Sequence, residues 1–525
     1  MAITAMGMVQ NNHVYLLAAL LLTPSLVSAN EWTFEPSIKT NETYSDNINY
    51  DSQDKESSFV NQTSLGLVTK YKSASTTYNI DFEAINATYS HDSTFNDIYY
   101  NLTSNAEVQL WTNGLSLIGT ASINNEPRNT VNNIYADIVF GDTIQVERYS
   151  GGLAYSIDNS KYSLDTNLIY NITKSEDGIG ESEGYSAILN SRSGSNSAPI
   201  FWDITNNYLE RENNSSDGRS YQSEFKVGYI TPYKFNPFIR YYDEGNSGNV
   251  GNGTTSESNS YGAGFRWLMA TRLTLDLSYN IPVDDDSTDS DEEQDNYYDV
   301  NLSWQPTQRT SLNAGVSQRF YGDSYSFNLT HSNKRLTNTI TYNESLQVFT
   351  RDNLNFLIGG DLCSFSDATT DCFALLQEAL INDPQQDIPL VITEDESFSL
   401  YKTFSWNSVL NLRRTTFALN AERSDRENLA TQIKSLRESL DFTVSRDVSR
   451  YSSVDLSATY TKTDDVIGFP QERNSQYRYY KMSYNRELNK TLTFDVSVSH
   501  LNRASNFADF VYKENRISFE LKKVL

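Results

Sequence analysis

LTLDLSYNI, residues 273–281, alternates apolar and polar side chains without a break. Its odd positions carry Leu, Leu, Leu, Tyr and Ile, and its even positions carry Thr, Asp, Ser and Asn. Successive side chains of a β-strand point to opposite faces, so this strand would have one apolar and one polar face. The apolar face suits contact with lipid and the polar face suits a wet lumen, as in a transmembrane β-barrel. A soluble β-sandwich or β-helix also alternates, so the rest of the chain has to be considered.

The same alternation returns along the chain, for example at 300–304, 325–331, 454–460 and 492–500. Between the alternating segments, short links alternate with longer connections, and the longer ones are 44–58, 124–142, 174–184, 245–258, 282–295, 351–396, 464–473 and 503–511. Outer-membrane barrels have short turns on the periplasmic side and long loops outside. The pattern therefore predicts an all-β fold, a large antiparallel transmembrane β-barrel of about 24 strands within a range of roughly 20–26.

Composition agrees with a barrel whose outer face alone is apolar. The hydrophobic content is 38% and the mean hydropathy is -0.54, which a barrel with long wet loops tolerates. Aromatic residues make up 13% of the chain, including 35 Tyr, and such rings form the girdles at both membrane interfaces. Three tryptophans at expected strand ends are predicted girdle anchors, with stacking on sugar rings as the alternative: Trp202, Trp267 and Trp304.

The chain divides into a leader and one large domain. Residues 1–29 are typical of a secretory signal peptide, because the apolar stretch 14–22 is followed by Pro24 and by small residues before Asn30. Residues 30–525 form the predicted barrel. Its longest connection, 351–396, contains the chain's two cysteines, Cys363 and Cys372. In an oxidising exported compartment these two predict a disulfide that staples the connection. We expect this connection to act as a plug or lid, with a surface protrusion as the alternative.

Charge excludes one class of partner. The formal net charge is -26, and much of the acid lies in connections such as 284–293. Nucleic acid is therefore not expected, since its phosphates would be repelled. The acidic run 284–293 lacks the spaced glycine of an EF-hand loop and is interpreted as a solvated loop. No metal or cofactor is predicted.

The sequence contains no recognisable set of catalytic residues. Beyond the leader the histidines are His91, His331 and His500, and no hydrolase or metal motif surrounds them. Any two inward carboxylates could act as an acid pair, but lumen lining is the stronger interpretation for Asp276, Asp455 and Asp495. The sequence thus predicts no catalytic residues.

The expected inward positions are mostly Ser, Thr, Asn and Asp, with scattered Arg437 and Arg516. A channel for a polyanion would need a ladder of basic residues. A neutral or weakly charged glycan fits this lining better.

Two stretches resemble one family. They are SWQPTQRTSLNAGVSQRFYGDSYSFNLTHSNKRLTNTITYNESL, residues 303–346, and EPSIKTNETYSDNI, residues 35–48. Both are similar to the PEP-CTERM system-associated outer-membrane β-barrel family. The resemblance implies a non-enzymatic protein of the Gram-negative outer membrane, linked to exosortase and exopolysaccharide loci, that serves polysaccharide export or surface assembly. It implies as partners outer-membrane lipids, the barrel assembly machinery, exopolysaccharide and periplasmic export components. The alternatives are a porin-like channel for small solutes and a barrel-anchored surface scaffold or adhesin.

Overall fold

The computed structural model describes residues 31–525 apart from 111–113, 129–133, 142, 195, 198, 214–216, 249–255, 284–294, 348–349, 359–360, 364–389, 396–397, 430–432, 468–471 and 508–509. The predicted signal peptide, the acidic run 284–293 and Cys372 lie outside the described residues. The signal peptide and the Cys363–Cys372 disulfide therefore stay predictions.

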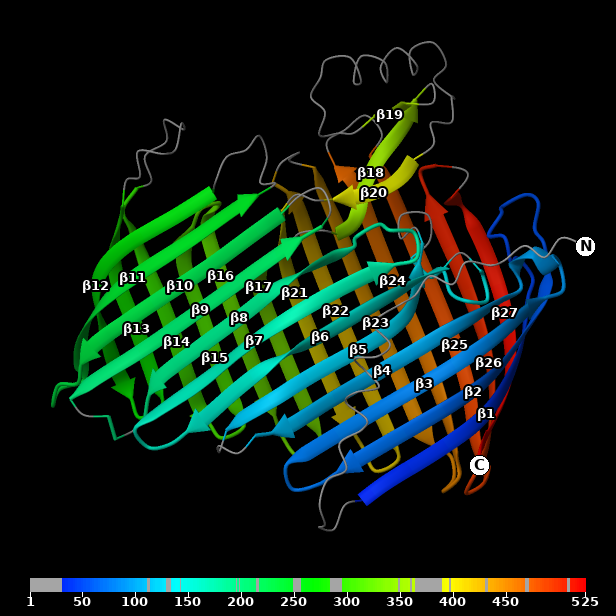
Figure 1. Ribbon diagram of the computed structural model, residues 1–525, viewed down its shortest axis with the longest axis horizontal. Helices are drawn as coiled ribbons and strands as arrows, with labels where there is room; N and C mark the ends of the chain where they lie inside the picture. The colour runs from blue at the N-terminus through cyan, green and yellow to red at the C-terminus, as the bar shows by residue number, and fades with distance from the viewer. Residues whose placement is uncertain are drawn as a thin grey trace, which may run out of the picture.

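Twenty-four strands form one closed antiparallel ring. Each strand pairs with its neighbours in sequence, β17 pairs with β21, and β27 pairs with β1 to close the ring, as Figure 1 shows. The ring strands are β1 (Glu31–Ser45), β2 (Ser58–Lys72), β3 (Thr76–Tyr89), β4 (Asp97–Gln109), β5 (Leu115–Pro127), β6 (Thr143–Asp158), β7 (Tyr162–Ser175), β8 (Ser182–Ser193), β9 (Ile200–Glu212), β10 (Asp217–Tyr229), β11 (Phe235–Gly248), β12 (Ser256–Ala270), β13 (Leu273–Pro282), β14 (Tyr297–Thr307), β15 (Thr310–Arg319), β16 (Gly322–Ser332), β17 (Leu336–Gln347), β21 (Ser399–Asn411), β22 (Thr415–Asn428), β23 (Lys434–Asp447), β24 (Ser452–Ile467), β25 (Arg473–Asn489), β26 (Leu492–Ser505) and β27 (Tyr512–Val524). The predicted fold class and strand number are confirmed.

Side chains alternate across the wall as the sequence predicts. In β13 the even residues Asp276, Ser278 and Asn280 are buried on the inner face, whereas Tyr279 and Ile281 are exposed on the outer face. The outer face carries a band of exposed apolar side chains around the ring, including Leu65, Leu168, Ile239, Leu456 and Val498. A closed ring leaves no unpaired strand edge in hydrocarbon, which is the condition for crossing a bilayer with strands. The protein is an integral β-barrel of the bacterial outer membrane, where barrels of even strand number occur.

The connections sort to the two rims as predicted. Short links such as 73–75, 271–272 and 308–309 lie at one rim, where β1 begins and β27 ends. The longer connections lie at the other rim. One of them contains the short 3-10 helix η1 (Ser93–Phe95), which Asp92 caps. Among the described residues no helix is long and apolar enough to cross a membrane.

The turn between β15 and β16 is the shortest connection on the long-loop rim and has only two residues, Phe320 and Tyr321. Gly322 follows it with a φ of +102°. Glycine tolerates this left-handed backbone, which allows the tight reversal.

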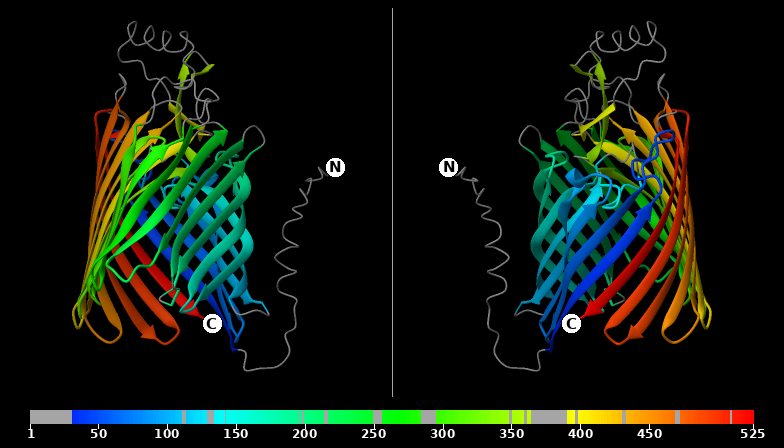
Figure 2. Two further views of the ribbon diagram at one scale, coloured as in Figure 1. Left: turned by 90° about the vertical axis from the view of Figure 1, so that its left-hand side faces the viewer. Right: turned by 90° about the vertical axis from the view of Figure 1, so that its right-hand side faces the viewer.

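Three further strands lie outside the ring. β18 (Thr350–Ile358) pairs with β19 (Asp361–Cys363) and with β20 (Leu390–Asp395), all within the long connection between β17 and β21. Figures 1 and 2 show this small sheet beyond the long-loop rim. The residues between β19 and β20, 364–389, are not described, so the predicted plug or lid stays a prediction.

The ring is flattened in cross-section. It is wider than tall in Figure 1 and narrower than tall in the side views of Figure 2. The two broad walls therefore meet at two narrow edges, one around β12 and β13 and one around β27 and β1. The contacts at these edges decide how much of the lumen is open.

Candidate functional site

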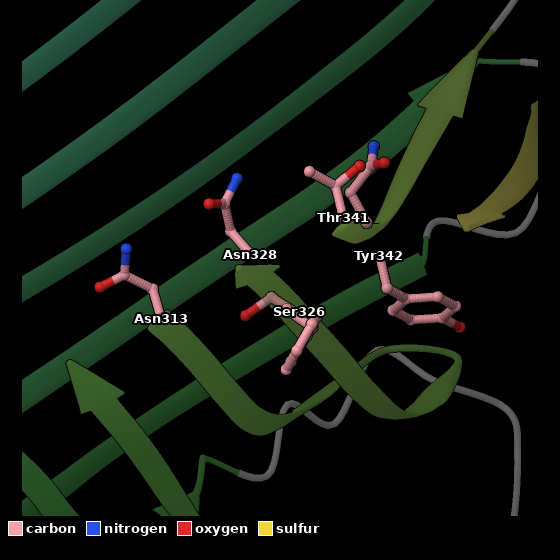
Figure 3. Close-up of a pocket in the computed structure, with 7 residues that line it drawn as sticks. Asn313, Ser326, Asn328, Thr341 and Tyr342 are labelled. Atoms are coloured by element: carbon pink, nitrogen blue, oxygen red, sulfur yellow. The ribbon is translucent and has the colours of Figure 1, made fainter. Parts of the chain in front are cut away.

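The inner wall between the two edges is lined by uncharged polar side chains. Asn313 in β15 lies opposite Asn328 in β16, which lies opposite Thr341 in β17, which lies opposite Ser405 in β21. The Oγ atoms of Thr341 and Ser405 are 2.6 Å apart and hydrogen-bonded. Figure 3 shows Asn313, Asn328 and Thr341 projecting to one side of the wall and the ring of Tyr342 to the other. We call Asn313, Asn328, Thr341 and Ser405 the neutral row.

A shallow open depression of about 330 Å³ lies along this row. Its lining includes the amides of Asn313, Asn328 and Asn343 and the hydroxyl residues Ser326 and Thr341. Asn313, Ser326, Asn328 and Asn343 are all exposed although they face the interior of the ring. Exposed amides on an inner wall require water beside them, so this part of the lumen is open.

Ion pairs fill the narrow edge around β12 and β13. Arg240 of β11 is buried and contacts Glu224 of β10 at 2.7 Å and Asp299 of β14 at 3.3 Å. Lys226 lies 3.7 Å from the same Asp299. Lys226, Arg240 and Asp299 are buried, so water screens the attraction between these charges only weakly, whereas Glu224 keeps 29% of its side chain exposed. This cluster, Glu224, Lys226, Arg240 and Asp299, is named the edge cluster.

A second buried pair extends the edge cluster toward the long-loop rim. The Nε atom of Arg319 in β15 lies 3.1 Å from both carboxylate oxygens of Glu244 in β11. β11 and β15 are separated by three strands, so this direct contact requires a sharp bend of the sheet. The edge is therefore closed by contacts between side chains of strands that are not neighbours in the ring.

The opposite edge is filled by a connection that folds inward. In the connection between β5 and β6, residues 134–141 are described. Asp137 accepts a hydrogen bond of 2.6 Å from Arg516 of β27. The ring of Phe140 stacks on Tyr50 at 4.3 Å, and Tyr50 stacks on Tyr512 of β27 at 4.5 Å. We call residues 134–141 the inner loop.

The inner loop also contacts the two broad walls. Tyr135 lies against Tyr477 and Tyr479 of β25 on one wall. On the other wall the hydroxyl of Tyr89 donates to the carbonyl of Ile138. Val139 packs there with Val60 of β2 and Ala87 of β3. The inner loop thus bridges the lumen at this end.

Burial changes the chemistry of the β1–β2 connection beside the inner loop. It raises the pKa of the Tyr50 hydroxyl well above its usual range, although Arg516 opposes the shift. Tyr50 therefore stays neutral, and its oxygen accepts a hydrogen bond of 2.5 Å from Arg516. The guanidinium of Arg516 is shared between Tyr50, Asp137 and Glu514.

The three predicted lumen carboxylates all lie on the inner face but not together. Asp276 accepts two hydrogen bonds, of 2.8 and 2.7 Å, from Arg266 of β12. Asp455 in β24 and Asp495 in β26 are separated by β25, where they lie opposite Ser483 and Asn485. No cluster of three metal-ligating side chains occurs in the described part of the chain.

The three predicted girdle tryptophans lie on the outer face, near the short-link ends of their strands. Trp304 is 42% exposed. Trp267 stacks on Phe235 at 5.4 Å, and the Nε1 atom of Trp202 donates to Ser191 at 3.0 Å. They are on the lipid side of the wall, away from the lumen. Anchoring at the membrane interface stays their predicted role.

The sequence missed the edge cluster and the inner loop. The signal for the inner loop was present as apolar residues, Ile134, Tyr135, Ile138, Val139 and Phe140, in a connection otherwise expected to be wet. The edge cluster left no local signal, because its members look like ordinary inward residues of separate strands.

No family model matches the chain, and no curated protein matches it. Among solved structures it is similar to the FrpB iron transporter of Neisseria meningitidis, with 9% identity, a TM-score of 0.43, and coverage of 93% of this chain and 82% of that one. It is also similar to the siderophore receptor PirA of Acinetobacter baumannii, with 8% identity, a TM-score of 0.40, and coverage of 95% of this chain and 81% of that one. A third similar structure is an anion-selective porin of Comamonas acidovorans, with 9% identity, a TM-score of 0.34, and coverage of 94% of this chain and 100% of that one. Identities this low place the chain in no family.

Proposed function

We propose that the protein is a non-enzymatic outer-membrane channel that passes a neutral or weakly charged polysaccharide, in exopolysaccharide export or surface assembly. The observation that carries this proposal is the neutral row Asn313, Asn328, Thr341 and Ser405 on the open part of the inner wall, in which both asparagines are exposed. Amides and hydroxyls both donate and accept hydrogen bonds, which matches the hydroxyl groups of sugars.

The distribution of charge supports a neutral cargo. The buried charges of the lumen are paired, as in the edge cluster and in Arg266 with Asp276. A paired charge projects a weak field and does not concentrate an ionic cargo. The neutral row carries no charge at all. A polyanion would find no continuous basic path along the described inner wall.

The resemblance to the PEP-CTERM system-associated family supports the choice of an exopolysaccharide. The resembling segment 303–346 spans most of β14 to β17, and it contains Asn313, Asn328 and Thr341 of the neutral row. The proposed partners are the exopolysaccharide and the periplasmic export components that would deliver it. Outer-membrane lipids surround the apolar band, and the barrel assembly machinery would insert the chain.

Deletion of the gene tests the physiological role. We expect polysaccharide to accumulate in the periplasm while synthesis continues, and the wild-type gene to restore secretion. Unchanged secretion in the deletion strain would contradict export and would favour a porin or a surface scaffold.

Current through the purified barrel in a planar bilayer tests the pore itself. We expect a steady conductance that the neutral oligosaccharide maltohexaose interrupts and that dextran sulfate does not. Asn328→Asp adds a charge to the neutral row and should leave the conductance while weakening the block by maltohexaose. A barrel that conducts no ions would instead support the scaffold.

A further inference from the structure

The links at the short-link rim of the ring carry only positive charge. They are 73–75, 110–114, 159–161, 194–199, 230–234, 271–272, 308–309, 333–335, 412–414, 448–451 and 490–491. In a chain with 67 Asp and Glu against 41 Lys and Arg, these links contain no acidic residue and ten basic ones. The basic ones are Lys161, Lys234, Arg272, Arg309, Lys334, Arg335, Arg413, Arg414, Arg450 and Lys490. We call these ten side chains the basic rim.

The basic rim runs along both broad walls and around the β12–β13 edge, at the lower rim of Figure 1. All ten side chains are exposed, and none of them forms an ion pair in the part of the chain that the structure describes. Like charges on neighbouring turns repel one another, so negative charge outside the protein would stabilise them. The acidic connections of the chain join strands at the opposite rim and do not supply it.

Turn hydrogen bonds hold the basic rim at a fixed level. The side-chain oxygen of Asn333 accepts from the backbone N–H of Arg335 at 3.0 Å, and that of Asn489 accepts from the N–H of Thr491 at 2.9 Å. In the link 412–414 the N–H of the first residue donates to the carbonyl of Thr415 at 2.8 Å. Each turn closes within a few residues of its strands, so the charges lie where the apolar band of the wall ends.

Exposed apolar side chains lie beside these charges. Tyr233, next to Lys234, is 76% exposed. Val448 and Tyr451 flank Arg450 and are 54% and 62% exposed. Apolar groups this exposed suit the acyl region of a bilayer, whereas Lys and Arg side chains reach the phosphates just outside it. A soluble acidic protein would match the charges but would leave the apolar side chains in water.

We propose that the basic rim is a binding surface for the phosphate groups of anionic phospholipids in the periplasmic leaflet. The short turns of outer-membrane barrels face the periplasm, and Lys and Arg at a membrane surface attract anionic lipids. The rim thereby collects anionic lipid around the barrel and fixes its depth in the bilayer. This binding is independent of what crosses the lumen, since it involves only side chains at the outside of the short links.

Tryptophan fluorescence reports on this leaflet without an added label. Five tryptophans lie in the half of their strand that is closer to the short links, namely Trp32, Trp202, Trp267, Trp304 and Trp406. The sixth, Trp111, belongs to the link 110–114. The purified, folded barrel is reconstituted in two sets of vesicles with the same mixture of phosphatidylcholine and phosphatidylglycerol. In one set the phosphatidylglycerol carries brominated acyl chains, and in the other set an equal amount of the phosphatidylcholine does. Bromine quenches the tryptophans only from lipids that touch the barrel.

We expect brominated phosphatidylglycerol to quench more than brominated phosphatidylcholine. The association constant of the anionic lipid relative to the neutral one should be about fivefold, which corresponds to about 1 kcal/mol. Added salt should bring this ratio toward one, because it screens charges at the membrane surface.

A variant of the basic rim and a matched control locate the binding surface. The rim variant neutralises four bases near exposed tryptophans and combines Arg272→Gln, Arg309→Gln, Arg413→Gln and Arg414→Gln. The control makes the same change of charge with four exposed bases of the opposite rim, Lys55→Gln, Lys434→Gln, Arg478→Gln and Lys513→Gln. We expect the preference for phosphatidylglycerol to fall in the rim variant and to stay at the wild-type value in the control. Heat-dependent gel mobility confirms that each barrel is folded.

Equal quenching by the two lipids in the wild-type barrel would overturn the proposal and leave an acidic periplasmic protein as the occupant of the basic rim. A preference that survives unchanged in the folded rim variant would also overturn it, because the anionic lipid would then bind elsewhere. An equal loss in the rim variant and the control would show a general effect of net charge and would likewise contradict a surface at this rim. None of these results bears on polysaccharide export, because no polysaccharide is present.

Discussion

Arg516 on the last strand donates through Nη1 to Oδ2 of Asp137 at 2.6 Å, although the two residues lie 379 positions apart in the sequence. The pair ties the inner loop to the strand that closes the ring. The position of the inner loop is therefore linked to the strand whose pairing with β1 closes the ring. The free cross-section of the lumen at this edge depends on that contact.

Asp137→Ala should loosen the inner loop and enlarge the pore. Arg516 keeps Tyr50 and Glu514 as partners, so we expect the barrel to lose only about 1 kcal/mol of stability. Single-channel conductance in a planar bilayer should rise. The control is Glu126→Gln, which breaks the exposed pair with Arg148 on the inner wall of β5 and β6. Equal conductance in Asp137→Ala and the wild type would show that the inner loop does not limit the pore.

Arg240→Met should destabilise the barrel strongly. It leaves Glu224 and Asp299 without their main partner in the buried edge cluster, and breaking a buried ion pair costs about 3–5 kcal/mol. Urea unfolding in lipid vesicles measures the loss. Arg148→Met removes an arginine of an exposed pair and should cost about 1 kcal/mol or less. Equal losses in the two variants would mean that the edge cluster is solvated.

Leu65→Arg should distinguish the lipid face from the lumen face. Leu65 is 61% exposed at the middle of β2 on the outer face, where an arginine at the bilayer midplane costs about 2–4 kcal/mol. Thr103→Arg makes the same change on the exposed inner face of β4 and should be tolerated. Unfolding of both variants in lipid vesicles measures the loss of stability and so tests the assignment of the faces. A larger loss of stability in Thr103→Arg than in Leu65→Arg would reverse that assignment.

The predicted disulfide of Cys363 and Cys372 is tested by labelling of thiols. We expect no reaction of the exported protein with a maleimide in denaturant until a reductant is added, and two labels per chain afterwards. Labelling before reduction would show free thiols. The staple of the long connection would then be excluded.

The alternation of LTLDLSYNI and of its counterparts was sufficient to predict the barrel, because the faces of a strand are set by a local period of two residues. Connection lengths predicted the two rims and a strand number of about 24, and the ring has 24. The inward positions of Asp276 and Arg516 followed from the same period. These features are local, so neighbouring residues alone determine them.

Only the tertiary structure decided what fills the lumen. The edge cluster depends on the sharp bend that brings β10 and β11 against β14 and β15, and no local pattern encodes that bend. The sequence did not predict that 134–141 enters the lumen, and the plug or lid expected from 351–396 stays a prediction. The backbone pairing of β16 with β17 ends halfway along the two strands, although both strands have ordinary alternating sequences. Curvature and side-chain contacts between strands distant in sequence arise when the ring closes, and they set the shape of the channel.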